Sequence, residues 1–304
     1  MMRLGSLATV PQMVAARRVL LACCVVFLLA LVGPVRAGAV IGGKVIRASR
    51  YPGVVQVVAN DFVGGQGTLC GGALIAPRLV VTAGHCFLHV PFHSLKPVSV
   101  VFGRQWSHPH KNPPTGIRIS VDRVAHAPID PKLHQSFPDD VEVLHLRRGA
   151  PIKALKLGSP QAARAGTPVF VLGWGLTSNH ESELRRNQLH GLAMHVRSDA
   201  LCHRVAGSEY DAATQICLTA RPSAGLQGTC YGDSGAPLLS ADGSTVLGTV
   251  STSNNFCGKG ASIYTRLTSG PLRHWVERQI SASRVDFPHA PASDQTLWRI
   301  RTLN

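Results

Sequence analysis

The chain has 304 residues, of which 45% are hydrophobic and 15% charged, so it can build a sizeable core and is not a mostly disordered protein. Its formal net charge of +15 favours weak attraction to anionic surfaces such as membranes, polysaccharide or nucleic acid, although a simpler interpretation is solubility. The sequence contains no aromatic-interleaved basic patch, Gly-rich phosphate loop or zinc-finger spacing, so we expect no specific nucleic-acid recognition.

The first predicted element is a secretory signal over residues 1–39. Arg17 and Arg18 precede an apolar run at 19–33, and the small residues Ala-Gly-Ala at 37–39 follow it. A basic region, an apolar core and a small-residue end are the three parts of a secretory signal. The apolar run is shorter than the roughly 20 residues that a membrane helix needs. We therefore expect a secreted protein, or a periplasmic one if its source is bacterial.

Export determines how the cysteines are interpreted. Cys23 and Cys24 lie in the signal, and six cysteines remain after it: Cys70, Cys86, Cys202, Cys217, Cys230 and Cys257. An even number of cysteines in an oxidising compartment predicts three disulfides, while the spacing alone leaves their pairing open. None of the six belongs to a C-x-x-C pair, so we predict neither a zinc site nor a redox site.

Three stretches downstream of the signal carry residue types that work together in hydrolysis. They are "LVVTAGHCF" at 79–87, which contains His85, "DDVEVLHL" at 139–146, and "CYGDSGAPLL" at 230–239, which contains Ser234. A serine hydroxyl needs a positioned base, and an imidazole can act as that base near neutral pH. A buried carboxylate can fix the imidazole tautomer, and N–H groups in a Gly-flanked turn can stabilise an oxyanion.

These stretches occur in the order His, Asp, Ser, and further motifs accompany them. The motifs are "VIGG" at 40–43, "CGGALIAPRLVVTAGHC" at 70–86, "VLGWG" at 171–175, "GTVS" at 248–251 and "IYTRL" at 263–267. Together they resemble the trypsin/chymotrypsin family of serine endopeptidases over about residues 40–281. The resemblance implies an all-β domain of two antiparallel six-stranded β-barrels with a C-terminal helix, with the active site between the barrels.

Other parts of the chain follow from this comparison and from local patterns. The crossover between the barrels should lie near residues 149–160. Apolar residues recur at helical spacing over 271–280, which predicts the C-terminal helix. The tail at 282–304 has no clear period, and its sequence leaves open disorder, partner binding or later removal. The short apolar runs between many glycines and prolines are typical of strands and turns.

The resemblance implies a role for each residue of the site. Ser234 is the nucleophile, His85 the general base and then acid, and Asp140 its partner, with Asp139 as the rival for that last role. The N–H groups of Gly232 and Ser234 form the oxyanion hole. Ser251 supports the catalytic Asp. The resemblance also implies the disulfides Cys70–Cys86, Cys202–Cys217 and Cys230–Cys257.

The resemblance places Gly228 at the base of the substrate pocket, where trypsin-like enzymes carry Asp. Cleavage after Lys or Arg is therefore disfavoured, because a buried charge needs a partner. Ser253 and Ser262 stand at two wall positions and should narrow the pocket. We predict cleavage after small or medium uncharged residues. The hydroxyls of this pocket, with Lys259 nearby, leave acidic side chains as the alternative.

Two residues depart from the family pattern near the site. Ala236 replaces a usual Gly just after the nucleophile, and Thr252 stands where Trp is common. Neither change removes a catalytic group, but both bear on the rate and the range of substrates.

The junction at 37–43 predicts how the enzyme is switched on. In the family a cut frees an Ile or Val whose α-amino group pairs with the Asp beside the nucleophile, here Val40 and Asp233. Arg36 lies too early for such a cut, whereas cleavage after Ala39 frees Val40 directly. We expect export and activation to be one cut.

No cofactor or metal is expected. The loop at 103–116 contains no acid, and a calcium site needs carboxylate oxygens. The expected partners are polypeptide substrates, and the expected state is a monomer. Two alternative functions fit parts of the sequence: a secreted binding or antimicrobial protein on a protease scaffold, and an esterase. The set His85, Asp140 and Ser234 argues against the first, and the lack of a lipase-type G-x-S-x-G argues against the second.

Overall fold

The structure is a computed structural model that describes residues 40–59, 67–87, 98–107, 116–128, 139–176, 188–207, 210–219, 225–253 and 257–285. The predicted signal at 1–39 lies outside the described residues. Of the predicted tail at 282–304, residues 282–285 belong to the C-terminal helix instead, and the rest lies outside the described residues. Within the described ranges, no helix is both long and apolar enough to span a membrane.

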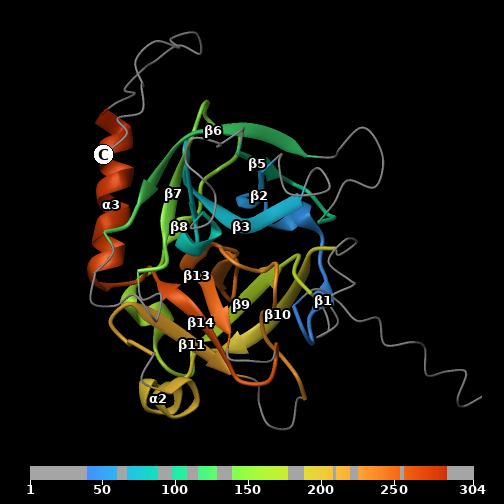
Figure 1. The fold of residues 1–304 in the computed structure, drawn as a ribbon, viewed down its shortest axis with the longest axis vertical. Helices are drawn as coiled ribbons and strands as arrows, with labels where there is room; N and C mark the ends of the chain where they lie inside the picture. The colour runs from blue at the N-terminus through green and yellow to red at the C-terminus, as the bar shows by residue number, and fades with distance from the viewer. Residues whose placement is uncertain are drawn as a thin grey trace, which may run out of the picture. The chain divides into compact units, whose positions relative to one another are not determined.

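The first half of the described chain forms a closed antiparallel barrel in the order β2-β3-β4-β7-β6-β5 (Figure 1). Alternate side chains of these strands point inward, as the period of two in an extended chain requires. Val55, Leu74, Val100 and Leu144 are fully buried in this interior. The strands are β2 (Val54–Ala59), β3 (Gly67–Ala76), β4 (Leu79–Thr82), β5 (Ser99–Phe102), β6 (Ile117–His126) and β7 (Glu142–Leu146).

The second half forms a curled sheet in the order β1-β10-β9-β12-β13-β14-β11, with β8 pairing parallel to β13. All other pairs in this sheet are antiparallel. Its strands are β1 (Lys44–Val45), β8 (Lys156–Leu157), β9 (Pro168–Gly173), β10 (His190–His195), β11 (Gln215–Thr219), β12 (Pro237–Ser240), β13 (Thr245–Ser253) and β14 (Ala261–Arg266).

The predicted all-β class and C-terminal helix are confirmed. In the second barrel, β10 and β11 do not form a continuous ladder of hydrogen bonds. A single bridge joins Val196, just after β10, to Leu218 of β11. The chain leaves β10 at His195 and enters the helix α2 (Asp199–Ala206) after only three residues. Too few extended residues remain there to pair with β11, so the sheet curls without completing the ladder.

The crossover lies where the sequence predicted it. β7 ends at Leu146, and β8 at Lys156–Leu157 already belongs to the second sheet. Short 3-10 helices stand at three turns: η1 (Ala48–Arg50), η2 (Gly84–Cys86) and η5 (Pro160–Ala163).

A shared apolar core holds the two halves together. Val81 and Val143 of the first barrel lie in one cluster with Leu172 and Leu239 of the second sheet. The helix α3 (Gly270–Val285), drawn in red in Figure 1, contributes to the same cluster. The apolar residues whose spacing predicted this helix face the core. Three of them are buried, Leu272, Trp275 and Val276, and Ile280 is partly buried.

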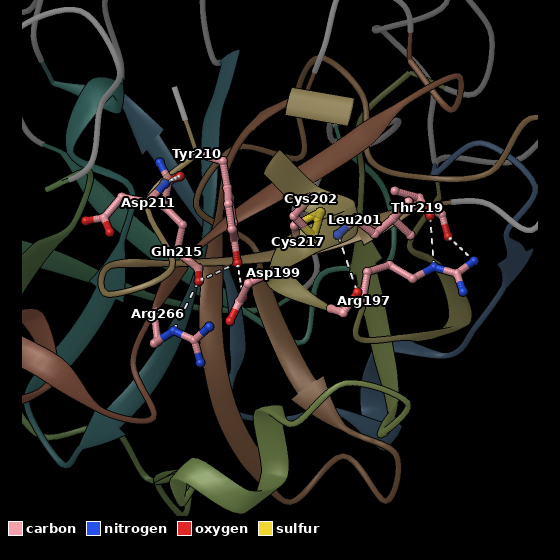
Figure 2. The surroundings of a disulfide bond; sticks show 11 residues. Arg197, Asp199, Leu201, Cys202, Tyr210, Asp211, Gln215, Cys217, Thr219 and Arg266 are labelled. Carbon is pink, nitrogen blue, oxygen red and sulfur yellow. Dashed lines mark hydrogen bonds between the residues drawn. A yellow bond between two sulfur atoms is a disulfide. The ribbon is translucent and has the colours of Figure 1, made fainter. Parts of the chain in front are cut away.

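Three disulfides brace the described chain, with the pairing that the family resemblance implied: Cys70–Cys86, Cys202–Cys217 and Cys230–Cys257. Figure 2 shows the second of them joining α2 to β11. Beside it the hydroxyl of Tyr210, which lies in the segment between α2 and β11, donates to the Asp199 carboxylate over 2.7 Å, so α2 is held by a hydrogen bond as well as by the disulfide.

Candidate active site

His85 and Asp140 come together because β4 and β7 are neighbours in the first barrel. Thr82 at the end of β4 lies opposite Glu142 at the start of β7. This register puts η2, which follows β4, against the turn that precedes β7. The Nδ1 atom of His85 lies 2.8 Å from Oδ2 of Asp140, and the backbone N–H of His85 donates to Oδ1 over 2.7 Å. Two bonds from one carboxylate therefore fix both the ring and the backbone of His85.

Asp140 also receives support from the second sheet. The Ser251 hydroxyl donates to its Oδ2 over 2.5 Å, and the Thr265 hydroxyl donates to its backbone carbonyl over 2.7 Å. Its side chain is fully buried. The structure thus places Asp140, and not its neighbour Asp139, against the imidazole. A buried carboxylate that accepts several hydrogen bonds is held in place and can orient the imidazole and stabilise a positive imidazolium.

The environment of His85 favours the protonated ring. Burial alone would lower its pKa, but the hydrogen bond to Asp140 and the negative charges of Asp140 and Glu142 raise it by more. The pKa of His85 therefore lies above its ordinary value, which makes the ring a stronger base.

Ser234 reaches the same place from the second sheet. Its carbonyl accepts the N–H of Gly71 over 2.7 Å, and the next residue, Gly235, has φ +73°. A Cβ at Gly235 would lie 2.9 Å from the backbone N of Ala83, closer than real Cβ contacts come. The turn that carries Ser234 is thus pressed against the backbone two residues before His85, and a Gly is needed for that approach.

The backbone around Ser234 leaves two N–H groups unused. Within the part of the chain that the structure describes, the N–H groups of Asp233, Gly235 and Ala236 donate to the carbonyls of Cys230, Val250 and Asp233. In the same described set, those of Gly232 and Ser234 donate to no protein acceptor. Two free N–H donors with one residue between them, the second on a half-buried serine, suit a developing oxyanion.

Asp233 is buried completely beneath this turn. Its two carboxylate oxygens accept the N–H groups of Gly175, over 2.8 Å, and Cys230, over 2.9 Å. Burial raises its pKa to about 7, and those two hydrogen bonds, which lower the pKa, do not cancel the effect. A carboxylate in such a place needs a cation to be stable in its charged form.

Val40 lies in the interior of the second sheet. Its exposed fraction is 0%, and it belongs to the same apolar cluster as Ala236 and Val250. The next residue, Ile41, bridges Gly228. Val40 has φ +59°, a left-handed conformation that a β-branched residue adopts only under strain.

The predicted pocket residues lie together at the joint between β13, β14 and the loop before Ser234. A Cβ at Gly228 would lie 2.7 Å from the Ser262 hydroxyl oxygen, so this hydroxyl lies close against the residue predicted to form the base of the pocket. The same oxygen accepts the N–H of Thr229 over 3.2 Å. Ser253 pairs with Ser262 across β13 and β14, and Lys259 is exposed. Residues 254–256 lie outside the described ranges.

Two residues near the site were not singled out by sequence reasoning. Tyr231 is 73% exposed and precedes the first free N–H donor, at Gly232. Glu142 is buried two residues after Asp140. The signal for Glu142 was in "DDVEVLHL", where a charged residue takes an inward position of the strand.

The absence of a metal or cofactor stays a prediction. Among the described residues, the one group that could gather around a metal ion is Cys70, His85 and Cys86. Its two sulfurs form a disulfide with each other and offer no thiolate. The loop at 103–116, considered for calcium, lies mostly outside the described residues.

Comparisons with known proteins agree with this geometry. The trypsin family model matches residues 40–276. Serine protease 56 of Mus musculus is 30% identical over 261 residues, which cover 81% of this chain and 39% of that protein, so the chain spans less than half of this relative. Trypsin of Saccharopolyspora erythraea is 31% identical over 205 residues, covering 66% of this chain and 81% of that protein.

The fold is also that of solved structures. Human heparin binding protein superposes with a TM-score of 0.61 at 24% identity, covering 79% of this chain and 96% of that structure. This likeness shows the architecture, while the family model and the relatives show the descent. The chain belongs to the trypsin family of serine proteases.

Proposed function

We propose that this protein is a secreted serine endopeptidase that hydrolyses peptide bonds through an acyl-enzyme. The observation that carries the proposal is the hydrogen-bonded series Ser251, Asp140 and His85, beside a serine turn with two free N–H donors. A binding protein on the same scaffold would have no need to keep this series intact. An esterase would use the same chemistry, and peptide cleavage distinguishes the two.

Each group has a step in the reaction. The Ser234 hydroxyl attacks the substrate carbonyl while Nε2 of His85 takes its proton, and Asp140 holds the proton on Nδ1. The resulting oxyanion accepts hydrogen bonds from Gly232 and Ser234. His85 then gives its proton to the leaving amine. Water, activated by the same imidazole, hydrolyses the ester in the reverse sequence of steps and frees Ser234.

The pocket supports cleavage after small or medium uncharged residues. Ser262 occupies the space above Gly228, and a glycine at position 228 offers no carboxylate to pair with Lys or Arg. The alternative substrate has an acidic side chain that accepts a hydrogen bond from the Ser262 hydroxyl. This hydroxyl already accepts the Thr229 N–H and so can still donate its own proton.

The substitution Ser262→Ala separates these two substrate classes. If the pocket selects small neutral residues, kcat/KM for a peptide with Ala before the scissile bond should change by less than about threefold, since the methyl group keeps the shape. If it selects acids, kcat/KM for Asp or Glu peptides should fall by roughly tenfold or more. A peptide library profiled with both proteins measures the effect. Preferred cleavage after Lys or Arg by the wild type would contradict both readings.

The activation pair is part of the same proposal. Cleavage between Ala39 and Val40 gives Val40 an α-amino group, which can pair with the buried carboxylate of Asp233. The cut also abolishes the φ dihedral of Val40, because that angle is defined by the preceding residue. A cut at this bond would therefore relieve strained backbone and supply the cation that Asp233 needs.

The charge of the protein supports weak binding to anionic polysaccharide. Five arginines gather where β6, β7 and the β3–β4 turn meet, and we call them the arginine face: Arg78, Arg118, Arg123, Arg147 and Arg148. Arg78 donates to the carbonyls of Leu146 over 2.9 Å and Arg147 over 2.7 Å, which holds its guanidinium beside the end of β7. Burial and then the Arg123 charge lower the pKa of the nearby His145 to about 4.

This face can be tested by its salt dependence. The double substitution Arg147→Glu and Arg148→Glu should elute from a sulfated dextran column at clearly lower salt than the wild type, because each lost contact reduces the ions released on binding. The matched control is Arg164→Glu with Arg204→Glu, which makes the same charge change at exposed positions of the second half. Equal elution of the two doubles would show that only net charge matters, and the face would then be no site.

A further inference from the structure

Glu142 occupies a position that the barrel pattern reserves for an apolar side chain. The residues Leu146, Leu144 and Glu142 alternate along β7 and point to the same side, and the two leucines belong to the interior cluster of the first barrel. Glu142 is only 4% exposed. Burying a carboxylate is costly unless it is paired, so its presence here calls for a reason beyond packing.

His126 holds this carboxylate from the neighbouring strand. The two residues face each other directly in the β6–β7 register, and Nδ1 of His126 lies 2.5 Å from Oε1 of Glu142. The His126 side chain is 41% exposed, so the pair reaches from solvent into the barrel. The second oxygen, Oε2, is buried and has no hydrogen-bond partner within the described residues.

The barrel register places Glu142 near the catalytic pair, because Glu142 stands two residues after Asp140 and opposite Thr82, the residue of β4 that shortly precedes His85 in η2. The charged or titratable groups that act on it in the described chain are His126 of β6, His85 of η2 and Asp140 just before β7. β4 opposes it with Thr82, a neutral residue whose hydroxyl donates to the Gly71 carbonyl. Glu142 is therefore a second carboxylate close enough to act on the imidazole of His85.

The proton affinities agree with this arrangement. Burial raises the pKa of Glu142, and His126, which lowers it, does not cancel the effect. The bond to Glu142 raises the pKa of His126 in turn. On His85, the Glu142 charge acts in the same direction as Asp140. The two carboxylates together thus favour a protonated His85.

We propose, on the basis of the function proposed above, that Glu142 is a positioning residue which, anchored by His126, increases the basicity of His85. Asp140 sets the tautomer and orientation of the ring by direct contact, whereas Glu142 acts through its charge. A more basic imidazole takes the Ser234 proton more readily, but it also remains protonated, and inactive as a base, to a higher pH. Glu142 therefore lowers the activity at acid pH and raises the rate at neutral and alkaline pH.

The test is Glu142→Gln, which keeps the shape of the side chain and removes its charge. The acid limb of kcat/KM against pH should move down by roughly half a unit, and the plateau at alkaline pH should fall about two- to fivefold. Asp122→Asn is the matched control, since it removes a carboxylate from β6 in the same barrel. In the wild type, Oδ1 of Asp122 lies 3.9 Å from Nε of Arg147, so this carboxylate has a basic neighbour. The control should leave the acid limb unchanged.

A second variant and a second readout keep the test decisive. Glu142→Met restores the apolar alternation of β7, so it should fold at least as stably as the wild type, because it removes a buried charge. It should show the same shift as Glu142→Gln. The pKa of His85 can also be followed by NMR in a Ser234→Ala background, which requires no turnover.

The outcomes separate this inference from the proposed function. If both Glu142 variants fold and neither moves the acid limb or the NMR titration of His85, the inference is wrong while the endopeptidase proposal stands. If the wild type cleaves no peptide but the NMR titration shifts as expected, the endopeptidase proposal fails and the electrostatic role of Glu142 stands. A shift in Asp122→Asn as large as that in Glu142→Gln would show only a general charge effect, and would overturn the inference.

Discussion

Ser234→Ala should lower kcat/KM for a cleaved peptide by roughly 10⁴- to 10⁶-fold while leaving the fold intact. The alanine removes the nucleophile, and the His85–Asp140 pair then has no hydroxyl to activate. The remaining rate should come from the two N–H donors and from substrate binding. The side chain of Ser234 makes no hydrogen bond that braces the described structure, so the unfolding midpoint should change little.

The measurement compares initial rates of the two proteins on the best peptide of the library, with circular dichroism as the check on folding. Ser283→Ala is the matched control, because its hydroxyl bonds only within α3, to the carbonyl of Ile280. It should keep full activity. Full activity in Ser234→Ala would show that the site has been assigned to the wrong serine.

A fixed extension before Val40 should lower activity by roughly 10²- to 10³-fold, which corresponds to the loss of one partner of a buried ion pair. The extension denies Asp233 the α-amino group and holds Val40 in its strained conformation. Asp233→Asn should cause a similar loss in the form that begins at Val40. The two changes together should cost little more than either one, because they remove the same pair.

The control is an extension that a site-specific protease removes to leave Val40 as the first residue, which should restore activity. N-terminal sequencing of the secreted protein then decides how the natural cut is made. A mature form that begins at Val40 supports one cut for export and activation. A secreted form that begins upstream of Val40 and stays inactive until trimmed would contradict the single cut. It would leave the proposed pairing of Val40 with Asp233 unaffected.

The same pair has a pH signature. In the extended form the folded-state pKa of Asp233 is raised to about 7, above its value in the unfolded chain. The stability is therefore full below the unfolded-state pKa and declines as pH rises through about 7. In the form that begins at Val40 the α-amino group should stabilise the carboxylate and remove most of this decline. Unfolding curves at several pH values measure the difference.

The sequence predicted the main lines of the fold because its signals were local and repeated. The short apolar runs that become strands and the helical spacing of α3 could be identified directly from local side-chain patterns. The position of the crossover and the disulfide pairing came from likeness to a family. What remained out of reach was the closure of the second sheet, since no local pattern shows that α2 begins three residues after β10.

The candidate site was predictable in part for the same reason. His85 and Ser234 stand in short motifs that can be identified from the sequence alone. The choice between Asp139 and Asp140 depended on family likeness, and the structure shows a hydrogen bond from His85 to Asp140. Glu142 was overlooked because its importance depends on what faces it across β6, and cross-strand partners cannot be read from a single strand. The φ of Val40 is likewise a property of the folded chain alone.

Labelling with a serine-directed phosphonate, followed by peptide mapping, tests the central claim most directly. In protein that begins at Val40, the phosphonate should attach to Ser234 alone, and His85→Ala should slow the labelling by at least roughly 10³-fold because the base is gone. Absence of labelling in that protein, or labelling at another serine, would contradict the claim that Ser234 is a nucleophile activated by His85 and Asp140.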